Sequence, residues 1–314
     1  MQLEQTQPAH IFIRLWAYQA ERFPFVGHGL LIAAFSVSAI SYSMLLRGAA
    51  GWPEPKIVAA SFGNAFLFFL LLRIADEFKD HEEDARYRPH RPVPRGLVSL
   101  RELGSVGALC LAGQLVLTVW LEPALVLLLA LVWLYLGFMS KEFFVRDWLK
   151  ARPVTYLWSH MLIVPLIDFY TTACDWATAG HPAPPDGLLW FLTASFFNGL
   201  VIEVGRKIRA PQDEVVGVET YSTLWGPQRA ALVWLGAVAL TGMSALLAAR
   251  EIGFALPAAA VLVALLGGAV IAATRFLQAP SNRRARQLEA LSGLWTILMY
   301  LTVGAIPMVI RVVF

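Results

Sequence analysis

Long runs of apolar residues alternate with short polar segments along the whole chain. Nine runs are long enough, or nearly so, to cross a bilayer core that requires about 20 helical residues; they cover roughly residues 25–46, 57–75, 103–121, 123–139, 154–170, 188–204, 230–249, 252–273 and 294–313. The runs are continuous, whereas membrane-spanning β-strands alternate between apolar and polar positions over about ten residues. The pattern therefore predicts an all-α membrane protein in which nine transmembrane helices pack as a bundle.

Basic residues gather in every second polar segment. Of the 25 lysines and arginines, 20 fall on the side of the N-terminus, four fall on the opposite side and Arg73 lies inside the second run. Lysine and arginine are enriched in the cytoplasmic segments of membrane proteins. The split therefore predicts a cytoplasmic N-terminus in a multi-pass protein of the lipid bilayer, and we expect a bacterial inner membrane.

The composition places the chain among membrane proteins. It is 58% hydrophobic and 15% charged, with a mean hydropathy of +0.60, whereas a soluble domain carries about 25% charged residues. Residues 1–24 are too polar for a cleavable signal peptide and are expected to form an amphipathic segment on the inner surface. Cys110 and Cys174 provide neither a disulfide framework nor the spacing of a metal site. We expect residues 1–314 to form a single membrane domain, with no nucleotide motif and no nucleic-acid partner.

The most informative polar segment runs from Asp76 to Gly96 and directly follows the second apolar run. Asp76, Asp80 and Asp84 are four residues apart, and residues with this spacing share one face of a helix. Carboxylates on one face repel each other unless a cation lies between them, and Mg²⁺ commonly takes one or two carboxylates plus substrate phosphate oxygens. A group of arginines follows, as a phosphorylated substrate would require: Arg86, Arg88, Arg91 and Arg95. A solvated, charged helix end is the alternative, but ionisable groups at the edge of a membrane segment are usually functional.

A second charged segment, residues 205–229, follows the sixth apolar run. Glu203 lies at the end of that run, and the segment continues with Arg206, Lys207 and Arg209 before it reaches Asp213. Two acidic loops on the same side of the membrane can converge over one cavity between the helices. They would then hold a Mg²⁺–diphosphate cluster at the mouth of an apolar cavity. Such a site suits a substrate with a charged head and a long hydrocarbon tail.

These segments resemble the signatures of the UbiA-type intramembrane prenyltransferases. The sequence DExxDxxxD at Asp76–Asp84, followed by RPVPRG at Arg91–Gly96, is similar to the first signature of that family, which usually reads NDxxDxxxD and then RPLxxG. The sequence GVETYSTLWG at Gly217–Gly226 is similar to the segment after the second acidic motif of the family. Motif spacing, loop position and number of helices agree over essentially the whole chain, so the resemblance implies a UbiA-like helical fold with cytoplasmic acidic loops.

The resemblance also implies an activity, namely Mg²⁺-dependent transfer of a prenyl group from a prenyl diphosphate to a small lipophilic or aromatic acceptor. The expected metal ligands are Asp76, Glu77, Asp80, Asp84, Glu203 and Asp213. The expected substrate-binding residues are Arg91, Asn198, Lys207 and Arg209. The expected catalytic set consists of Asp76, Asp80, Asp84, Asp213 and Lys141, a basic residue near the diphosphate. We assign His160 and Asp168, in the fifth run, to helix packing and to an interfacial role.

One position departs from the pattern of the family. Its second motif usually reads DxxxD, but here only the later position is an aspartate, Asp213, and the earlier one is Arg209. Glu203 can supply the missing carboxylate from the helix end. The departure leaves open a terpene cyclase of the same fold, in which a double bond of the substrate captures the allyl cation. A cation-linked membrane transporter is a further alternative, although transporter sites usually lie near the membrane midplane rather than in loops on one face.

Overall fold

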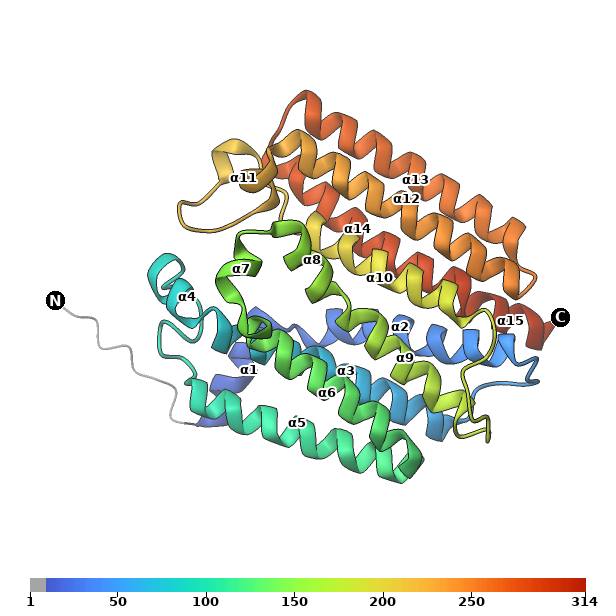
Figure 1. Cartoon of the computed structure of the whole chain (residues 1–314). Coiled ribbons are helices and arrows are strands. Elements are labelled where there is room, and N and C mark those ends of the chain that lie inside the picture. Colours follow the sequence, from blue (N-terminus) through green and yellow to red (C-terminus); the bar gives the residue numbers. More distant parts are fainter. Residues whose placement is uncertain (1–9) are drawn as a thin grey trace.

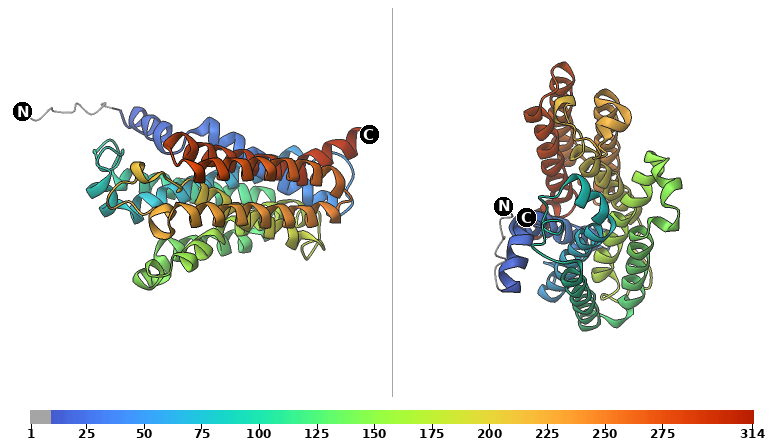
Figure 2. Two further views of the ribbon diagram at one scale, coloured as in Figure 1. Left: turned by 90° about the horizontal axis from the view of Figure 1, so that it is seen from above. Right: turned by 90° about the vertical axis from the view of Figure 1, so that its left-hand side faces the viewer.

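The computed structural model describes residues 10–314, and within that range it is a bundle of helices without β-strands. Eight of the described helices are long and apolar enough to cross a membrane. They are α2 (Phe25–Leu46), α3 (Pro55–Lys79), α5 (Leu100–Leu121), α6 (Val126–Ser140, preceded by the 3₁₀ turn η1, Pro123–Leu125), α10 (Leu188–Gly205), α12 (Pro227–Glu251), α13 (Ala255–Gln278) and α14 (Asn282–Val303, continued by α15, Ala305–Val313). The long helices run along one common direction (Figures 1 and 2). The predicted all-α membrane fold is therefore confirmed.

The fifth predicted segment is broken into two shorter helices, α8 (Pro153–Met161) and α9 (Ile163–Trp176). Pro165 explains the break, because it has no N–H to donate to the carbonyl of Met161 four residues earlier. The chain therefore kinks at Leu162, and α8 leads away from α9 towards the end of the bundle where the polar loops lie (Figure 1).

The short helices gather mainly at one end of the bundle. Figure 1 shows α4 (His81–Tyr87), α7 (Arg146–Lys150) and α11 (Tyr221–Trp225) at the end where the N-terminus also lies, whereas the C-terminus lies at the opposite end. The 3₁₀ turns η2 (Glu142–Phe144) and η3 (Pro211–Asp213) belong to the same polar loops. The loops that the sequence predicts on one side of the membrane are thus brought together.

The amphipathic N-terminal segment is represented by α1 (Ile11–Arg22). Tyr18 is buried, while Phe12 and Trp16 project into the surroundings. Such an arrangement suits a helix that lies on a membrane surface, and that placement stays a prediction. Residues 1–9 of the predicted segment 1–24 lie outside the described residues.

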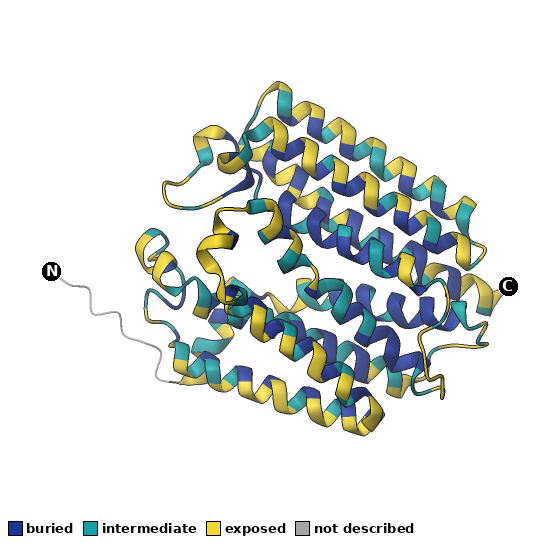
Figure 3. Cartoon of the chain, in the orientation of Figure 1, coloured by how far each residue is buried: buried dark blue, intermediate teal, exposed yellow. Residues whose placement is uncertain are grey.

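The core forms between the helices, and their outward faces are apolar but exposed. Figure 3 shows buried residues along the middle of the bundle and exposed residues along the outer faces of α5, α6 and α13. Lipid would cover these outer faces in a bilayer. In the core, α10 packs against α12, α14, α9 and α8.

The end of α10 is held tightly against α14. The indole N–H of Trp234 on α12 donates to Ser292 Oγ on α14 over 2.9 Å. A Cβ atom at Gly205, the last residue of α10, would overlap the side chain of Ser292. Only glycine permits this close approach. The close approach fixes the end of α10, which carries Glu203.

Candidate active site

A cavity of about 650 Å³ opens at the loop end of the bundle. Charged side chains from α3, α10 and the loops line its mouth. Its deeper wall is formed largely by apolar side chains, which include Leu31, Ile32, Phe35, Phe69, Leu72, Met161, Ile163 and Val164. The cavity therefore combines a polar mouth with an apolar interior, as a ligand with a charged head and a hydrocarbon tail would need.

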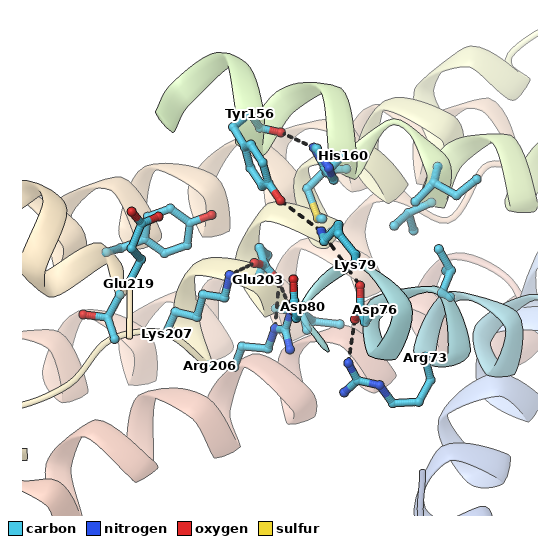
Figure 4. A pocket seen from close by; sticks show the side chains of 18 of the residues that line it. Arg73, Asp76, Lys79, Asp80, Tyr156, His160, Glu203, Arg206, Lys207 and Glu219 are labelled. Carbon is cyan, nitrogen blue, oxygen red and sulfur yellow. Dashed lines mark hydrogen bonds and ion pairs between the residues drawn. The ribbon is translucent and has the colours of Figure 1, made fainter. Parts of the chain in front are cut away.

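The first acidic motif contributes two carboxylates directly to the cavity. Asp76 lies in the last turn of α3, where Arg73 donates to Oδ2 over 2.7 Å and Lys79 Nζ lies 4.0 Å from Oδ1 (Figure 4). Asp80 follows the end of α3 and lines the same wall, and it makes no capping hydrogen bond to α4. Burial raises the pKa of Asp80, Lys79 opposes this effect, and the charge of Asp76 adds to it. The positive charge of Lys79 thus only partly offsets the cost of burying the Asp80 carboxylate, which lines the cavity.

Glu77 and Asp84 belong to the same motif but do not line the cavity. Glu77 is only 2% exposed, and Arg22 of α1 donates to its Oε1 over 2.6 Å. Asp84, on α4, is buried between Arg88 at 2.9 Å and Arg91 at 2.5 Å. Both arginines line the cavity. In this arrangement Asp84 positions two cations at the mouth, and Glu77 anchors α1 to α3.

The carboxylates at the mouth fit a divalent metal that also binds a phosphorylated substrate. Among residues 10–314, no group of three or more histidine, cysteine, aspartate or glutamate side chains is gathered as a metal site. Mg²⁺, however, needs only one or two carboxylates when substrate phosphates and water complete its octahedral shell. Asp76 and Asp80 provide these two carboxylates on one wall of the cavity.

The second charged segment presents a carboxylate that cations already neutralise. Glu203 is buried in the last turn of α10 and lines the cavity. Arg206 Nη2 lies 2.5 Å from its Oε2, and Lys207 Nζ lies 2.8 Å from its Oε1 (Figure 4). The charge of Glu203 raises the pKa of Arg206. The group of Glu203, Arg206 and Lys207 therefore carries a net positive charge. The Lys207 ammonium lies 5.7 Å from the ring centre of Tyr221.

The structure separates the other predicted site residues into two groups. Asn198 and Arg209 line the cavity; Thr296 donates to Asn198 Oδ1 over 3.0 Å, and Arg209 lies 3.9 Å from Glu289. Asp213 and Lys141 do not line it. Lys141 is exposed, and Asp213 lies in η3 with one buried carboxylate oxygen that has no hydrogen-bond partner. Asp213 and Lys141 therefore contribute no side chain to the cavity wall.

Another part of the cavity wall carries a polar cluster that the sequence did not indicate as a unit. It is formed by Lys79, Glu142, Tyr156 and His160. Lys79 Nζ lies 3.0 Å from the Tyr156 hydroxyl, which in turn lies 3.0 Å from Glu142 Oε1. His160 Nε2 lies 3.1 Å from Glu142 Oε2. His160 stacks on Tyr156 with ring centres 3.9 Å apart, so it combines the predicted packing role with a place in the cavity wall.

A strained turn carries Glu142 into this cluster. Glu142, Phe143 and Phe144 have φ angles of 51°, 52° and 62°, the left-handed region that non-glycine residues rarely adopt. Each such residue costs on the order of 1–3 kcal/mol and persists only where the surroundings enforce it. Burial tends to raise the pKa of Glu142, but the contacts with His160 and Lys79 outweigh burial, so its pKa lies below the usual value. No glycine or motif marks this turn in the sequence, so only the structure reveals it.

A salt bridge also joins α4 and α7 at the rim of the cavity. Lys150 Nζ lies 2.5 Å from Glu83 Oε1, and Arg146 lies 3.5 Å from the same oxygen. All three side chains line the cavity. Ion pairs therefore link the two loops that flank the mouth.

Comparison with known proteins agrees with this architecture. The sequence matches the UbiA prenyltransferase family over residues 33–298. A search of curated protein sequences finds no match. Among solved structures, the fold is similar to an apo UbiA homologue from Aeropyrum pernix K1, with 14% identity, a TM-score of 0.68, and coverage of 88% of this chain and 96% of the other.

Two further solved structures have the same fold. A digeranylgeranylglyceryl phosphate synthase is 15% identical with a TM-score of 0.54, over 94% of this chain and 99% of the other. A UbiA homologue from Archaeoglobus fulgidus bound to DMAPP and Mg²⁺ is 13% identical with a TM-score of 0.51, over 88% of this chain and 98% of the other. At these identities the likeness establishes the fold.

Proposed function

The chain belongs to the UbiA prenyltransferase family, and from this premise we propose that it transfers a prenyl group from a prenyl diphosphate to a small lipophilic or aromatic acceptor. It is an integral membrane enzyme with eight membrane-crossing helices among its described residues. The observation that carries the proposal is that the cavity, about 650 Å³ in total, has a charged mouth and an apolar interior. A diphosphate fits the first part and a hydrocarbon chain fits the second.

The cofactor is Mg²⁺, and the solved Archaeoglobus fulgidus homologue bound to DMAPP and Mg²⁺ supports this assignment. Asp76 and Asp80 would hold the ion, because both carboxylates line the mouth. When bound, the ion would offset the negative charge that the diphosphate gains as it leaves.

The cations around the mouth would bind the diphosphate directly. Arg91 faces the cavity from the first motif, while Arg206, Lys207 and Arg209 face it from the second. Fixed positive groups aimed at the leaving group stabilise the charge that develops when the allylic C–O bond breaks, and such preorganised charge is usually the largest contribution to catalysis. The second motif lacks one aspartate of the family pattern. Its arginine and lysine side chains would instead bind the diphosphate directly, without a metal ion between them.

The apolar interior would hold the prenyl chain and exclude water. Phe35, Phe69 and Tyr300 line this part, and the faces of their rings can stabilise an allyl cation. Exclusion of water protects the cation until the acceptor reaches it. We propose an electron-rich aromatic ring as the acceptor, and orientation in a bacterial inner membrane with the loops on the cytoplasmic side.

Product analysis tests this proposal and separates transfer from cyclisation. Purified protein is incubated with geranyl diphosphate and Mg²⁺, with and without a lipid extract of the host membrane, and the products are identified by mass spectrometry. Transfer predicts a prenylated product that forms only with the extract. A hydrocarbon or terpene alcohol that forms equally well without the extract would instead identify a cyclase of the same fold.

A further inference from the structure

The cluster of Glu142 and His160 has a composition that diphosphate binding does not explain. A carboxylate repels a diphosphate, yet the strained turn directs Glu142 into the cavity. Figure 4 shows Tyr156 and His160 on one side of Lys79 and the pair of Glu203 with Lys207 on the other. The wall that carries Glu142 and His160 is thus separate from the cationic wall formed by the second motif.

Two polar atoms of this cluster are buried and have no partner but each other. They are Glu142 Oε2 and His160 Nε2, which lie 3.1 Å apart. Glu142 is 4% exposed and His160 is 6% exposed, and both line the cavity. A carboxylate oxygen can accept more than one hydrogen bond, so Glu142 Oε2 can accept one from a ligand in the cavity as well as the contact with His160.

The other contacts of the pair fix its chemistry. His160 Nδ1 lies 2.8 Å from the carbonyl oxygen of Tyr156, which can only accept a hydrogen bond, so Nδ1 carries a proton. Nε2 is then the ring nitrogen that faces Glu142 Oε2. The second oxygen of Glu142, Oε1, accepts from the Tyr156 hydroxyl, and Lys79 Nζ lies 3.6 Å from it. A ligand hydroxyl group is complementary to Glu142 Oε2, because it donates a hydrogen bond to the carboxylate oxygen.

We propose that Glu142, positioned by His160, binds the acceptor through a hydroxyl group and takes the proton that the acceptor loses. This inference rests on the proposed prenyl transfer and names the acceptor class, a hydroxyl-bearing molecule. The bond between the prenyl C1 atom and the diphosphate oxygen breaks, and its electron pair leaves with the diphosphate. A new bond forms between C1 and an acceptor atom that carries hydrogen. The bond from that atom to its hydrogen then breaks, its electron pair stays on the acceptor, and the proton passes to Oε2 of Glu142.

A carboxylate of low basicity is sufficient for this step. Once the acceptor has bonded to the cation it is a strong acid, so proton loss needs a well-placed base rather than a strong one. Burial favours the neutral form of Glu142, but His160 and Lys79 outweigh burial and keep its pKa below the usual value. Glu142 is therefore ionised and ready to accept a proton at neutral pH. The titratable groups that face it are Lys79 from α3 and Tyr156 and His160 from α8.

The test compares the full-length Glu142→Gln variant with the wild type in two assays. The first is the affinity for geranyl diphosphate with Mg²⁺, measured by calorimetry. The second is the rate at which deuterium-labelled geranyl diphosphate and a host lipid extract give a prenylated product. We expect at least a hundredfold loss of product formation with affinity within threefold of the wild type. Glu82→Gln, at an exposed glutamate outside the cavity, is the matched control and should leave both values unchanged.

His160→Phe provides a second variant, because a phenyl ring can keep the stacking on Tyr156 while it removes both nitrogens. His160→Phe should show the same loss of product formation as Glu142→Gln. If Glu142→Gln does not fold, the product rate of His160→Phe tests the proposal in its place. A product rate within threefold of the wild type in the folded variant would overturn the proposal. An equal loss of geranyl diphosphate affinity would also overturn it, since the cluster would then serve the diphosphate. No product from the wild type would contradict the proposed transfer itself.

Discussion

Arg206 Nη2 lies 2.5 Å from Oε2 of Glu203, one turn earlier on the same chain segment. Lys207 Nζ approaches the other oxygen of this carboxylate to 2.8 Å. The carboxylate that could replace the missing aspartate of the second motif is thus shared by two cations. Both cations line the cavity and have side chains that are at least one-third exposed, so a diphosphate can reach them.

Glu203→Gln should strengthen metal-free binding of the diphosphate. The neutral amide no longer competes for Arg206 and Lys207, so we expect the affinity for geranyl diphosphate in EDTA to rise at least threefold. Calorimetry measures this directly. Glu82→Gln, at an exposed glutamate outside the cavity, is the matched control and should leave the affinity unchanged. An affinity that stays the same or falls would mean that the ion pairs of Glu203 do not compete with substrate.

Asp84→Ala should weaken substrate binding through the arginines that Asp84 holds. The buried carboxylate bonds Arg88 and Arg91 at 2.9 Å and 2.5 Å. Loss of a charge-assisted hydrogen bond costs about 1.5–3 kcal/mol, and we expect a lower unfolding temperature together with weaker binding of geranyl diphosphate. The two quantities come from thermal unfolding in detergent and from calorimetry. Normal stability with complete loss of Mg²⁺ dependence would instead assign Asp84 to the metal.

Asp80 should make the stability of the metal-free protein depend on pH. Burial raises its pKa in the folded protein, so the folded state binds the proton more tightly than the unfolded state does. The resulting stabilisation is complete below the ordinary carboxyl range, near pH 4, and is lost as the pH rises through the raised pKa. Unfolding of the wild type and of Asp80→Asn is compared in EDTA across this range. The wild type should lose stability relative to the variant as the pH rises, and parallel curves would refute the assignment.

Arg209 should contribute to binding of the diphosphate. Arg209→Ala removes a cation that lines the cavity, and loss of one charge-assisted hydrogen bond costs about 1.5–3 kcal/mol, or roughly tenfold to a hundredfold in affinity. Arg209→Asp restores the DxxxD spacing with Asp213, so it should retain more activity at high Mg²⁺ than the alanine variant does. Arg229→Ala, an exposed arginine outside the cavity, is the control. Unchanged Michaelis constants in both variants would mean that Arg209 faces lipid headgroups.

The membrane fold could be predicted from the sequence because a bilayer core imposes long, continuous apolar runs. All nine predicted segments are helical in the structure, and eight helices meet the length and composition of a membrane span within residues 10–314. Two interruptions were missed, the break at Gly304 between α14 and α15 and the kink between α8 and α9. Pro165 contained the signal for the kink, since proline leaves the carbonyl four residues earlier without a donor.

The acidic motif was harder to predict, because its spacing assumes one straight helix. Asp80 has φ −96° and ψ 7°, so α3 ends before it and α4 begins after it. Asp84 therefore lies on a different helix from Asp76 and does not share its face. The place of Glu142 in the cavity wall could not be predicted for a different reason. Three consecutive non-glycine residues adopt left-handed φ angles that no sequence pattern indicates.

The most direct test of the proposed activity is Mg²⁺-dependent release of diphosphate from geranyl diphosphate. Purified wild-type protein and Asp80→Asn are assayed with a host lipid extract, either with Mg²⁺ or with EDTA. If Asp76 and Asp80 hold the ion that offsets the leaving charge, the wild type releases diphosphate only with Mg²⁺, and Asp80→Asn is at least a hundredfold slower while its unfolding temperature is unchanged or raised. Release that is equal with Mg²⁺ and EDTA, or equal in the two proteins, would contradict the account.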